Sequence, residues 1–585
     1  MAGGQQSTVL RQFVRDLGSA FHPGDIRLVG LVGMVALVGT LAAFAVRFFE
    51  HAVEWLFALG YHRLPEVFTH LGMPQWVALL VYPFLIGLVV AAVKHLTPRP
   101  DRHHSVPLVI LSLAKRDGRL NPISTVLKTL GSVLTLGAGG SLGREGPVVL
   151  LGGGIGSAVG QLVRLRADWL NILVAAGAAA AIATTFHAPI TGALFVMEIV
   201  LIQFSARSFA LVALGSVVAA AVSEYLVGAP PFPIPAYPIE NPWEIALFLG
   251  LGLVIAPLSR IYIAILYGSE EMGKSIKRVP TWLKPALGGI LFGAVGLLIP
   301  ETLGTGYAAI SQAFTGSLPV LLLAGLLVAK LVTIGLTSGS GWVGGVFTPA
   351  LFLGSMAGGL YGQIAARVVP WLAPNPGAYA VVGMAAMIAG ATQAPLTAIT
   401  LVFEVTRDYR IALPAMLACG VAAVLSQRIS PYSVDTLHLP EHGVLLPWQV
   451  HDLRSLRVDE IMAREVHTVR TEMSLKDVIE VMQRSRHGGY PVLEADGRLV
   501  GMVTLRDVRE VPLERRLSTP VTAVMATRLI TLTPDQTLAD AAILMAKHGI
   551  GRLPVVDPAE PGRMLGIVSR SDILRAYPTE EGRER

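Results

Sequence analysis

The chain has 585 residues, of which 53% are hydrophobic and only 15% are charged, and its formal net charge is +6. Soluble globular domains carry roughly 25% charged residues, so this composition excludes an ordinary soluble protein and indicates a polytopic membrane protein. The single cysteine, Cys419, excludes an intrachain disulfide and a paired-thiol metal site.

Charged residues are concentrated near the C-terminal end. Residues 441–585 contain 41 of the 86 charged residues, and residues 1–440 contain the other 45. We therefore expect a membrane domain followed by a soluble tail. The polar, basic start of the chain is not a secretory signal, and its arginines predict a cytoplasmic N-terminus by the positive-inside rule.

Eleven apolar runs are long enough, or nearly long enough, to span a bilayer. They begin at about Leu28, Trp76, Pro122, Trp169, Phe209, Trp243, Pro285, Leu318, Phe347, Ala378 and Leu413. Gly and Pro interrupt several of them, as in "GREGPVVLLGGG" and "GGVFTPALFLG". Broken helices at membrane depth are tolerated where they line a cavity enclosed by protein, and they indicate a transporter-type binding site.

The two halves of the apolar region repeat each other. "FHAPITGALFVMEI" at 186–199 matches "TQAPLTAITLVFEV" at 392–405 with an offset of 206 residues. "PVVLLGGGIGSAVG" from Pro147 matches "PALFLGSMAGGLYG" from Pro349. The four-residue glycine spacing in the second pair predicts a bare helix face for close packing.

The tail also contains two copies of one unit. Residues 458–508 and 521–573 are similar, and each copy predicts the order strand, helix, strand, turn, strand, helix. "DG" at 496–497 predicts a hairpin turn. The predicted fold class is an all-α polytopic membrane domain with two related halves and broken helices, followed by an α+β pair.

Several motifs in the right order resemble one family. "GREGP" at 143–147, "GGVFTP" at 344–349, the two Ala-Pro…Glu blocks and Tyr432 in "SPYSVDT" together resemble the CLC family of chloride channels and chloride/proton exchangers. The tail resembles a tandem pair of CBS domains. The resemblance implies two halves of opposite orientation, a homodimer with an anion pathway in each subunit, and no enzymatic activity.

The expected organisation follows from the charge distribution and the resemblance. It comprises a cytoplasmic segment at 1–26, a CLC-type anion-transport domain at 27–440, a linker at 441–456, CBS domains at 457–513 and 518–577, and a tail at 578–585. We expect a multi-pass protein of the inner or plasma membrane with both termini in the cytoplasm. Its expected partners are chloride, protons, membrane lipid and a second copy of the chain, and no nucleic acid.

A chloride ion that enters a membrane loses most of its water, and helix N-termini can replace that water with backbone N–H groups. Proline suits the first turn of a helix, so "GREGP" and "GGVFTP" predict two helix starts directed at one point. The resemblance implies that backbone amides near Val346 and Phe347 bind the central chloride, with the hydroxyl group of Tyr432 on its inner side. The predicted anion-binding residues are His104, Ser105, Gly143, Arg144, Gly146, Gly345, Val346, Phe347 and Tyr432. For Tyr432, a place at the membrane interface is the alternative.

Arg144 and Glu145 are the only charged residues between Thr129 and Val163. A carboxylate is itself an anion, so Glu145 is predicted to occupy a chloride site when ionised and to leave it when protonated, as gate and proton carrier. A structural ion pair with Arg144 is the alternative. Arg144 and Lys128 are expected to supply positive potential that attracts anions.

Two segments depart from the family pattern. Where family members carry "GSGIP", this chain has "HHSVP" at 103–107, which puts His104 at the usual serine position and Ser105 one residue later. A histidine that only packs or faces solvent is the alternative. Exchangers also end the second block in paired glutamates, whereas here Ile199 follows Glu198.

The missing glutamate favours a voltage- and pH-dependent passive channel, and a chloride/proton antiporter is the alternative. Glu198 and its repeat counterpart Glu404 are expected to bond to nearby broken helices. A CBS-regulated magnesium transporter is a distant rival, because it needs clustered carboxylates that the membrane region lacks in sequence. A membrane metalloprotease is excluded by the absence of "HExxH".

Each CBS copy ends with a hydroxyl residue three positions before an aspartate, namely Thr504 with Asp507 and Ser569 with Asp572. In CBS pairs such residues can hold a nucleotide, with the hydroxyl group near phosphate and the carboxylate on the ribose. Simple helix capping is the alternative. An adenine nucleotide at this pair is the one cofactor that we expect, and transport requires neither it nor a metal.

Overall fold

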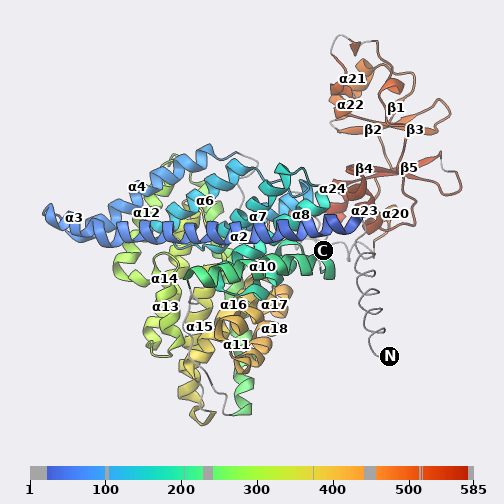
Figure 1. The fold of residues 1–585 in the computed structure, drawn as a ribbon. Helices are drawn as coiled ribbons and strands as arrows, with labels where there is room; N and C mark the ends of the chain where they lie inside the picture. The colour runs from blue at the N-terminus through green and yellow to red at the C-terminus, as the bar shows by residue number, and fades with distance from the viewer. Residues whose placement is uncertain are drawn as a thin grey trace, which may run out of the picture. The chain divides into compact units, whose positions relative to one another are not determined.

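The computed structural model describes residues 23–98, 105–202, 204–227, 237, 241–372, 375–440, 444, 456–485, 487–512, 515–516, 518–560 and 562–576. The chain divides into two compact units, Met1–Leu439 and Pro440–Arg585. The first unit is built from helices, and the second combines short helices with β-strands (Figure 1).

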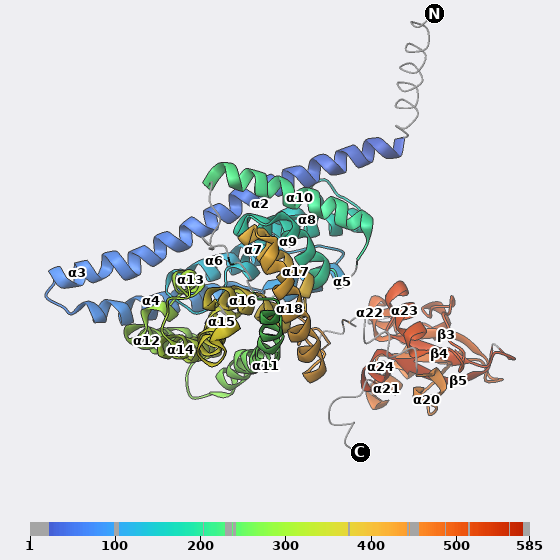
Figure 2. The same ribbon diagram turned by 90° about the horizontal axis from the view of Figure 1, so that it is seen from below.

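The first half of the helical unit begins with a long helix that passes beside several others. This helix, α2 (Pro23–Ala58), packs against α6, α7, α8 and α10, and both views show it running along this group (Figures 1 and 2). The other elements are η1 (Leu59–Arg63), α3 (Leu64–His70), α4 (Gln75–Leu96), α5 (Ser105–Lys115), α6 (Pro122–Gly137), α7 (Glu145–Leu162), α8 (Ala167–Phe186), α9 (Pro189–Phe195), the π-helical η3 (Val196–Val200) and α10 (Ala206–Val227).

The second half of the unit repeats the pattern of long and short helices. Its elements are η4 (Pro242–Glu244), α11 (Ile245–Ser275), α12 (Lys284–Leu298), η5 (Pro300–Thr302), α13 (Tyr307–Phe314), α14 (Val320–Gly339), α15 (Phe347–Val368), η6 (Pro370–Leu372), α16 (Pro376–Thr392), α17 (Pro395–Thr406) and α18 (Tyr409–Ile429). Within the described residues, seven helical segments are long and apolar enough to cross a membrane. Each of the eleven apolar runs begins within five residues of a helix start, so the prediction of a polytopic helical unit is confirmed.

Glycines let equivalent helix pairs approach closely in the two halves. In the first half α7 packs on α8, and in the second α15 packs on α16. A Cβ atom on Gly152 would lie 2.1 Å from the carbonyl oxygen of Gly177, and one on Gly354 would lie 2.4 Å from that of Gly383. The packing role predicted for the glycine spacing is therefore confirmed in both halves.

In the described part of the C-terminal unit there are one three-stranded sheet and one two-stranded sheet. The first copy has α20 (Val458–Ile461), β1 (Val469–Arg470), α21 (Leu475–Ser485), β2 (Gly489–Leu493), β3 (Leu499–Thr504) and α22 (Leu505–Glu510). β1 pairs with β2 in parallel, and β2 pairs with β3 in antiparallel fashion. Gly497 has φ +88° in the turn between β2 and β3, so the "DG" turn is confirmed.

The second copy differs at its first predicted strand. It contains η9 (Val521–Ala523), α23 (Leu538–His548), an antiparallel pair of β4 (Arg552–Val556) and β5 (Met564–Ser569), and α24 (Arg570–Ala576). The first strand expected here is wrong, because Leu532 makes only a single parallel bridge to Val555. In the first copy the N–H group of Thr471 extends the ladder to Leu493. Pro534 stands at the equivalent place and has no N–H group to donate.

The two tail copies complete each other's hydrophobic cores. Val458, at the start of the first copy, is fully buried in the core of the second. Val521, at the start of the second copy, is fully buried in the core of the first. Because each core needs one residue from the other copy, the tail is a single folding unit.

Candidate functional site

The residues that precede α7 and α15 pair with each other. The N–H group of Gly143 donates to the carbonyl oxygen of Gly345 at 2.7 Å, and the N–H group of Gly345 donates to that of Gly143 at 2.7 Å. The two glycines are 202 residues apart, as are Pro147 and Pro349, so equivalent positions of the repeat meet in an antiparallel bridge. The bridge brings the two helix starts together.

The carboxylate of Glu145 lies at the start of α15. The side chain is fully buried, at 0% exposure. The N–H group of Thr348 donates to Oε2 at 3.1 Å, and the Thr348 hydroxyl group donates to Oε1 at 2.6 Å and also to Oε2. The hydroxyl group of Tyr307 donates to Oε1 at 2.9 Å. The carboxylate thus occupies a helix N-terminus, which is an environment that favours anions.

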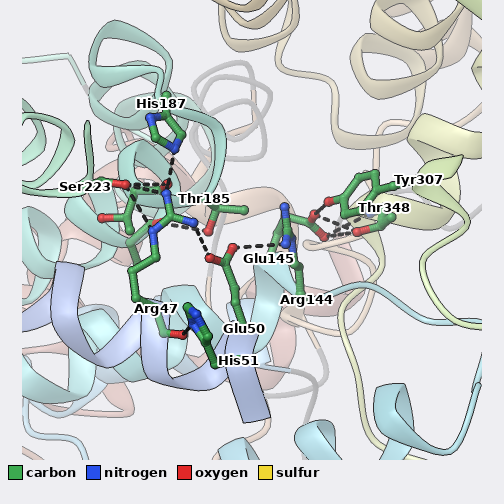
Figure 3. A network of polar contacts seen from close by, with 12 residues as sticks. Arg47, Glu50, His51, Arg144, Glu145, Thr185, His187, Ser223, Tyr307 and Thr348 are labelled. Atoms are coloured by element: carbon green, nitrogen blue, oxygen red, sulfur yellow. Dashed lines mark hydrogen bonds and ion pairs between the residues drawn. The ribbon is translucent and has the colours of Figure 1, made fainter. Parts of the chain in front are cut away.

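Arg144 pairs with a residue far away in the sequence (Figure 3). Its Nη1 lies 3.0 Å from Oε1 of Glu50 on α2, and its guanidinium lies 4.5 Å from the centre of the Tyr307 ring. Arg144 and Glu145 are both among the described residues and do not form an ion pair with each other. The alternative that Glu145 is the ion-pair partner of Arg144 is therefore wrong in this arrangement.

A second arginine extends this network toward the segment that links α8 and α9. Nη1 of Arg47 donates to Oε2 of Glu50 at 2.6 Å. Arg47 also donates to the hydroxyl group of Ser223 and the carbonyl oxygen of Thr184, and its Nη2 lies 2.6 Å from Nε2 of His187 (Figure 3). Sequence analysis missed Arg47 and Glu50. Two opposite charges inside the apolar run of α2 are a signal of pairing that could have revealed them.

Other predicted anion-binding residues surround the bridge. A Cβ atom on Gly146 would lie 3.0 Å from Cα of Gly345 and 3.6 Å from Cβ of Ser105, which is buried at the start of α5. The carbonyl oxygen of Val346 accepts a hydrogen bond from the Tyr262 hydroxyl group. Buried Phe347 begins α15, with its ring centre 6.0 Å from that of Phe186 and 5.9 Å from that of Phe195.

The remaining predicted residues are His104, Tyr432 and Lys128. His104 is outside the described residues. Tyr432 follows α18, and its carbonyl oxygen accepts from both terminal nitrogens of Arg260, at 2.9 and 2.7 Å. These contacts involve the backbone of Tyr432 and not its hydroxyl group. The role of the hydroxyl group at the chloride site therefore stays a prediction. Lys128 is buried in α6, where its positive charge lies inside the protein.

Glu198 and Glu404 cap helices of opposite halves. Oε1 of Glu198 accepts from the N–H group of Leu396, and Oε2 accepts from the N–H and hydroxyl groups of Thr397, at the start of α17. Glu404 accepts from the equivalent groups of Ile190 and Thr191 at the start of α9. The expectation that these carboxylates bond to broken helices is confirmed, and the exchange is reciprocal.

The hydroxyl–aspartate pairs of the tail cap helices. The N–H and hydroxyl groups of Thr504 donate to Asp507, and those of Ser569 donate to Asp572. The same arrangement occurs in Ser474 with Asp477 and in Thr537 with Asp540, at the starts of α21 and α23. These four residues therefore cap the last helix of each copy, as the capping alternative predicts.

An internally repeated helical unit, with a buried carboxylate at paired helix starts, defines a membrane transport protein. The family model described as voltage gated chloride channel matches residues 84–427, and the CBS domain model matches residues 458–514 and 521–579. The chain therefore belongs to the CLC family of chloride channels and transporters, which are not enzymes, and it carries a C-terminal tandem CBS pair. It is an integral, multi-pass membrane protein.

Some similar proteins are named as chloride channels and others as chloride/proton exchangers. The chain is 32% identical over 432 residues to "Putative chloride channel protein ClcB-like" of Ralstonia nicotianae, covering 71% of this chain and 99% of the relative. It is 32% identical over 449 residues to "H(+)/Cl(-) exchange transporter ClcA" of Salmonella agona, covering 72% and 90%. Its fold is similar to the crystal structure of a eukaryotic CLC transporter, with TM-score 0.69, 21% identity and coverage of 93% and 98%.

The buried position of Glu50 between two arginines generates a prediction about stability. Glu50→Gln leaves Arg47 and Arg144 without their carboxylate, and we expect the free energy of unfolding to fall by about 3–5 kcal/mol. Glu54→Gln, on the exposed side of the same helix, is the matched control and should change it by less than about 0.5 kcal/mol. Unfolding of the purified protein in detergent measures both. Equal midpoints for the two variants would contradict the structural role of Glu50.

Proposed function

We propose that the protein transports chloride through a pathway that Glu145 gates. The observation that supports this proposal is the place of the Glu145 carboxylate, which accepts hydrogen bonds from Thr348 at the start of α15. A helix start with free donors attracts an anion, so ionised Glu145 and chloride compete for the same donors. Protonation removes the charge of Glu145, and chloride then takes its place.

Within this family function we propose a passive channel, opened by protonation and by voltage. In the exchangers, a second glutamate passes protons from the cytoplasm, and Ile199 stands at that position here. Ile199 is buried and carries no titratable group. Glu198 next to it has both carboxylate oxygens engaged at the start of α17, which leaves it poorly suited to carry protons.

A chloride/proton antiporter is the second candidate. The name of the Salmonella agona relative supports it, and so does Glu145, which is an ionisable group at the anion site. A water-filled path could supply protons to Glu145 without a relay side chain.

We also propose the setting in which the protein works. Arginines ahead of the first apolar run support a cytoplasmic N-terminus in an inner or plasma membrane, and the tail then lies in the cytoplasm as well. We propose that the CBS pair regulates transport by binding an adenine nucleotide, with Asp507 and Asp572 toward the ribose and Thr504 and Ser569 toward phosphate.

Transport is tested in liposomes that contain the purified protein. We expect chloride efflux that rises as pH falls and moves no protons against their gradient. In Glu145→Gln the chloride flux should persist and lose its pH dependence, because the gate can no longer ionise. Uphill proton movement that stops in Glu145→Ala would contradict the passive channel and support the antiporter. Unchanged pH dependence in Glu145→Gln would show that Glu145 is not the gate.

Nucleotide binding is tested on the tail fragment 445–585, whose two cores are closed within the unit. We expect millimolar ATP, ADP or AMP to raise its melting temperature by mass action. Asp507→Ala should abolish the shift. Asp477→Ala removes a comparable helix cap and should retain it. If none of the three nucleotides raises the melting temperature, the tail does not bind them.

A homodimer is proposed from the apolar surface around the reciprocal caps. Ile190, Leu396 and Phe403 are 47%, 47% and 37% exposed on the short helices α9 and α17, and Val217 on α10 is 54% exposed. Helices α9 and α17 are too short to span a bilayer, so we expect a second copy rather than lipid to cover this surface. Light scattering in detergent should return the protein mass of two chains, and the mass of one chain would contradict the proposal.

A further inference from the structure

The geometry points to Tyr307 as a positioning residue that holds ionised Glu145 in its closed arrangement. This inference rests on the proposed gating function of Glu145. Tyr307 is the first residue of α13, and its hydroxyl group donates to Oε1 of Glu145 at 2.9 Å. It is the one side chain from outside the paired helix starts that donates to this carboxylate among the described residues.

The hydrogen-bond donors to Glu145 come from two elements, α15 and α13. Thr348 supplies its backbone N–H group and hydroxyl group at the start of α15, and both can serve chloride once the carboxylate leaves. Tyr307 approaches Oε1 from α13. Its hydrogen bond therefore stabilises the docked carboxylate in addition to what the helix start provides.

The segment before Tyr307 is anchored on two sides, so the hydroxyl group has a fixed position. The N–H group of Gly304 donates to the carbonyl oxygen of Gly139, in the segment that leads into "GREGP", at 2.8 Å. Lys330 on α14 is fully buried and donates to the carbonyl oxygens of Thr302 at 2.9 Å and Gly304 at 2.8 Å. Gly306, directly before Tyr307, has φ +74°, which a residue with a side chain rarely adopts.

The ring of Tyr307 is held from its face as well. The guanidinium of Arg144 lies 4.5 Å from the ring centre, a distance at which a cation is attracted to the aromatic face. Arg144 is in turn fixed by Glu50 at 3.0 Å. Tyr307 therefore touches both charged residues of "GREGP", because its hydroxyl group donates to Glu145 and its ring lies beside the Arg144 guanidinium (Figure 3).

The consequence is a shift in the pH at which the gate opens. A hydrogen bond to an ionised carboxylate favours the ionised form, which in this protein is the closed form. Tyr307→Phe keeps the aromatic ring beside Arg144 and removes the hydroxyl group that donates to Glu145. We expect half-maximal chloride flux at a proton concentration about tenfold lower, that is, at a higher pH, because hydrogen bonds to charged groups are strong.

The experiment compares five proteins in liposomes across a pH series: the original chain, Tyr307→Phe, Glu145→Gln, the double variant of these two, and a control. Tyr82→Phe is the matched control, because Tyr82 is also buried and donates at 2.8 Å to a neutral carbonyl oxygen, that of Leu56. We expect the Tyr307 change to shift the midpoint, the Tyr82 change to leave it, and the double variant to behave like Glu145→Gln. Loss of the effect in the double variant is the signature of action through Glu145.

The outcomes separate the two proposals. If Glu145→Gln retains the pH dependence, the gating function fails. If Glu145→Gln loses it but Tyr307→Phe leaves the midpoint unchanged, the role of Tyr307 is overturned. Should Tyr307→Phe not fold, as judged by its melting temperature, 3-fluorotyrosine at position 307 provides a stronger donor on the same ring. Its midpoint should then move to lower pH, and an unchanged midpoint would again overturn the inference.

Discussion

Backbone N–H groups at the starts of broken helices have no water to bind inside a membrane, so the protein itself must supply their acceptors. This constraint accounts for the placement of the three carboxylates. Glu404 serves the start of α9, Glu198 serves the start of α17, and Glu145 serves the start of α15. In each case the carboxylate comes from the half that does not contain the helix, so the same contacts that satisfy the backbone also join the halves.

The symmetry of this scheme fails at one place, the paired starts of α7 and α15. Glu198 and Glu404 exchange caps, and Gly143 pairs with its equivalent Gly345. Glu145 has no such counterpart, because the repeat places Phe347 at the equivalent position. The start of α15 thus receives a carboxylate, whereas Phe347 carries no acceptor and packs against Phe186 and Phe195. A symmetric pair of caps would satisfy both helix starts with fixed carboxylates, and the proposed gating function requires only the single carboxylate at α15 to exchange with chloride.

Sequence patterns predicted the features that depend on local chemistry or on repetition. The eleven apolar runs, the glycine faces, the capping role of Glu198 and Glu404 and the tail repeat are all visible as spacing. The partner of Arg144 was not predictable from its neighbour, since consecutive side chains diverge and Glu50 lies on another helix. Tyr307 and Glu145 are 162 residues apart, in segments that do not correspond in the repeat. The first strand of the second tail copy was predicted wrongly because of Pro534. Its missing N–H group matters only once the pairing register is known, because the equivalent N–H group of Thr471 donates to Leu493 in the first copy.

The reciprocal caps also constrain how the chain is made. Glu198 meets the N–H group of Leu396 across 198 residues of sequence. At about 5–20 residues per second, the ribosome needs roughly 10–40 s to make that stretch. Throughout this interval the newly made first half holds a carboxylate and an open helix start that lack their partners, and either would be costly to bury in lipid. Insertion of the second half therefore completes the first, and a chain that ends between the halves is left with an unfinished interior and a target for quality control.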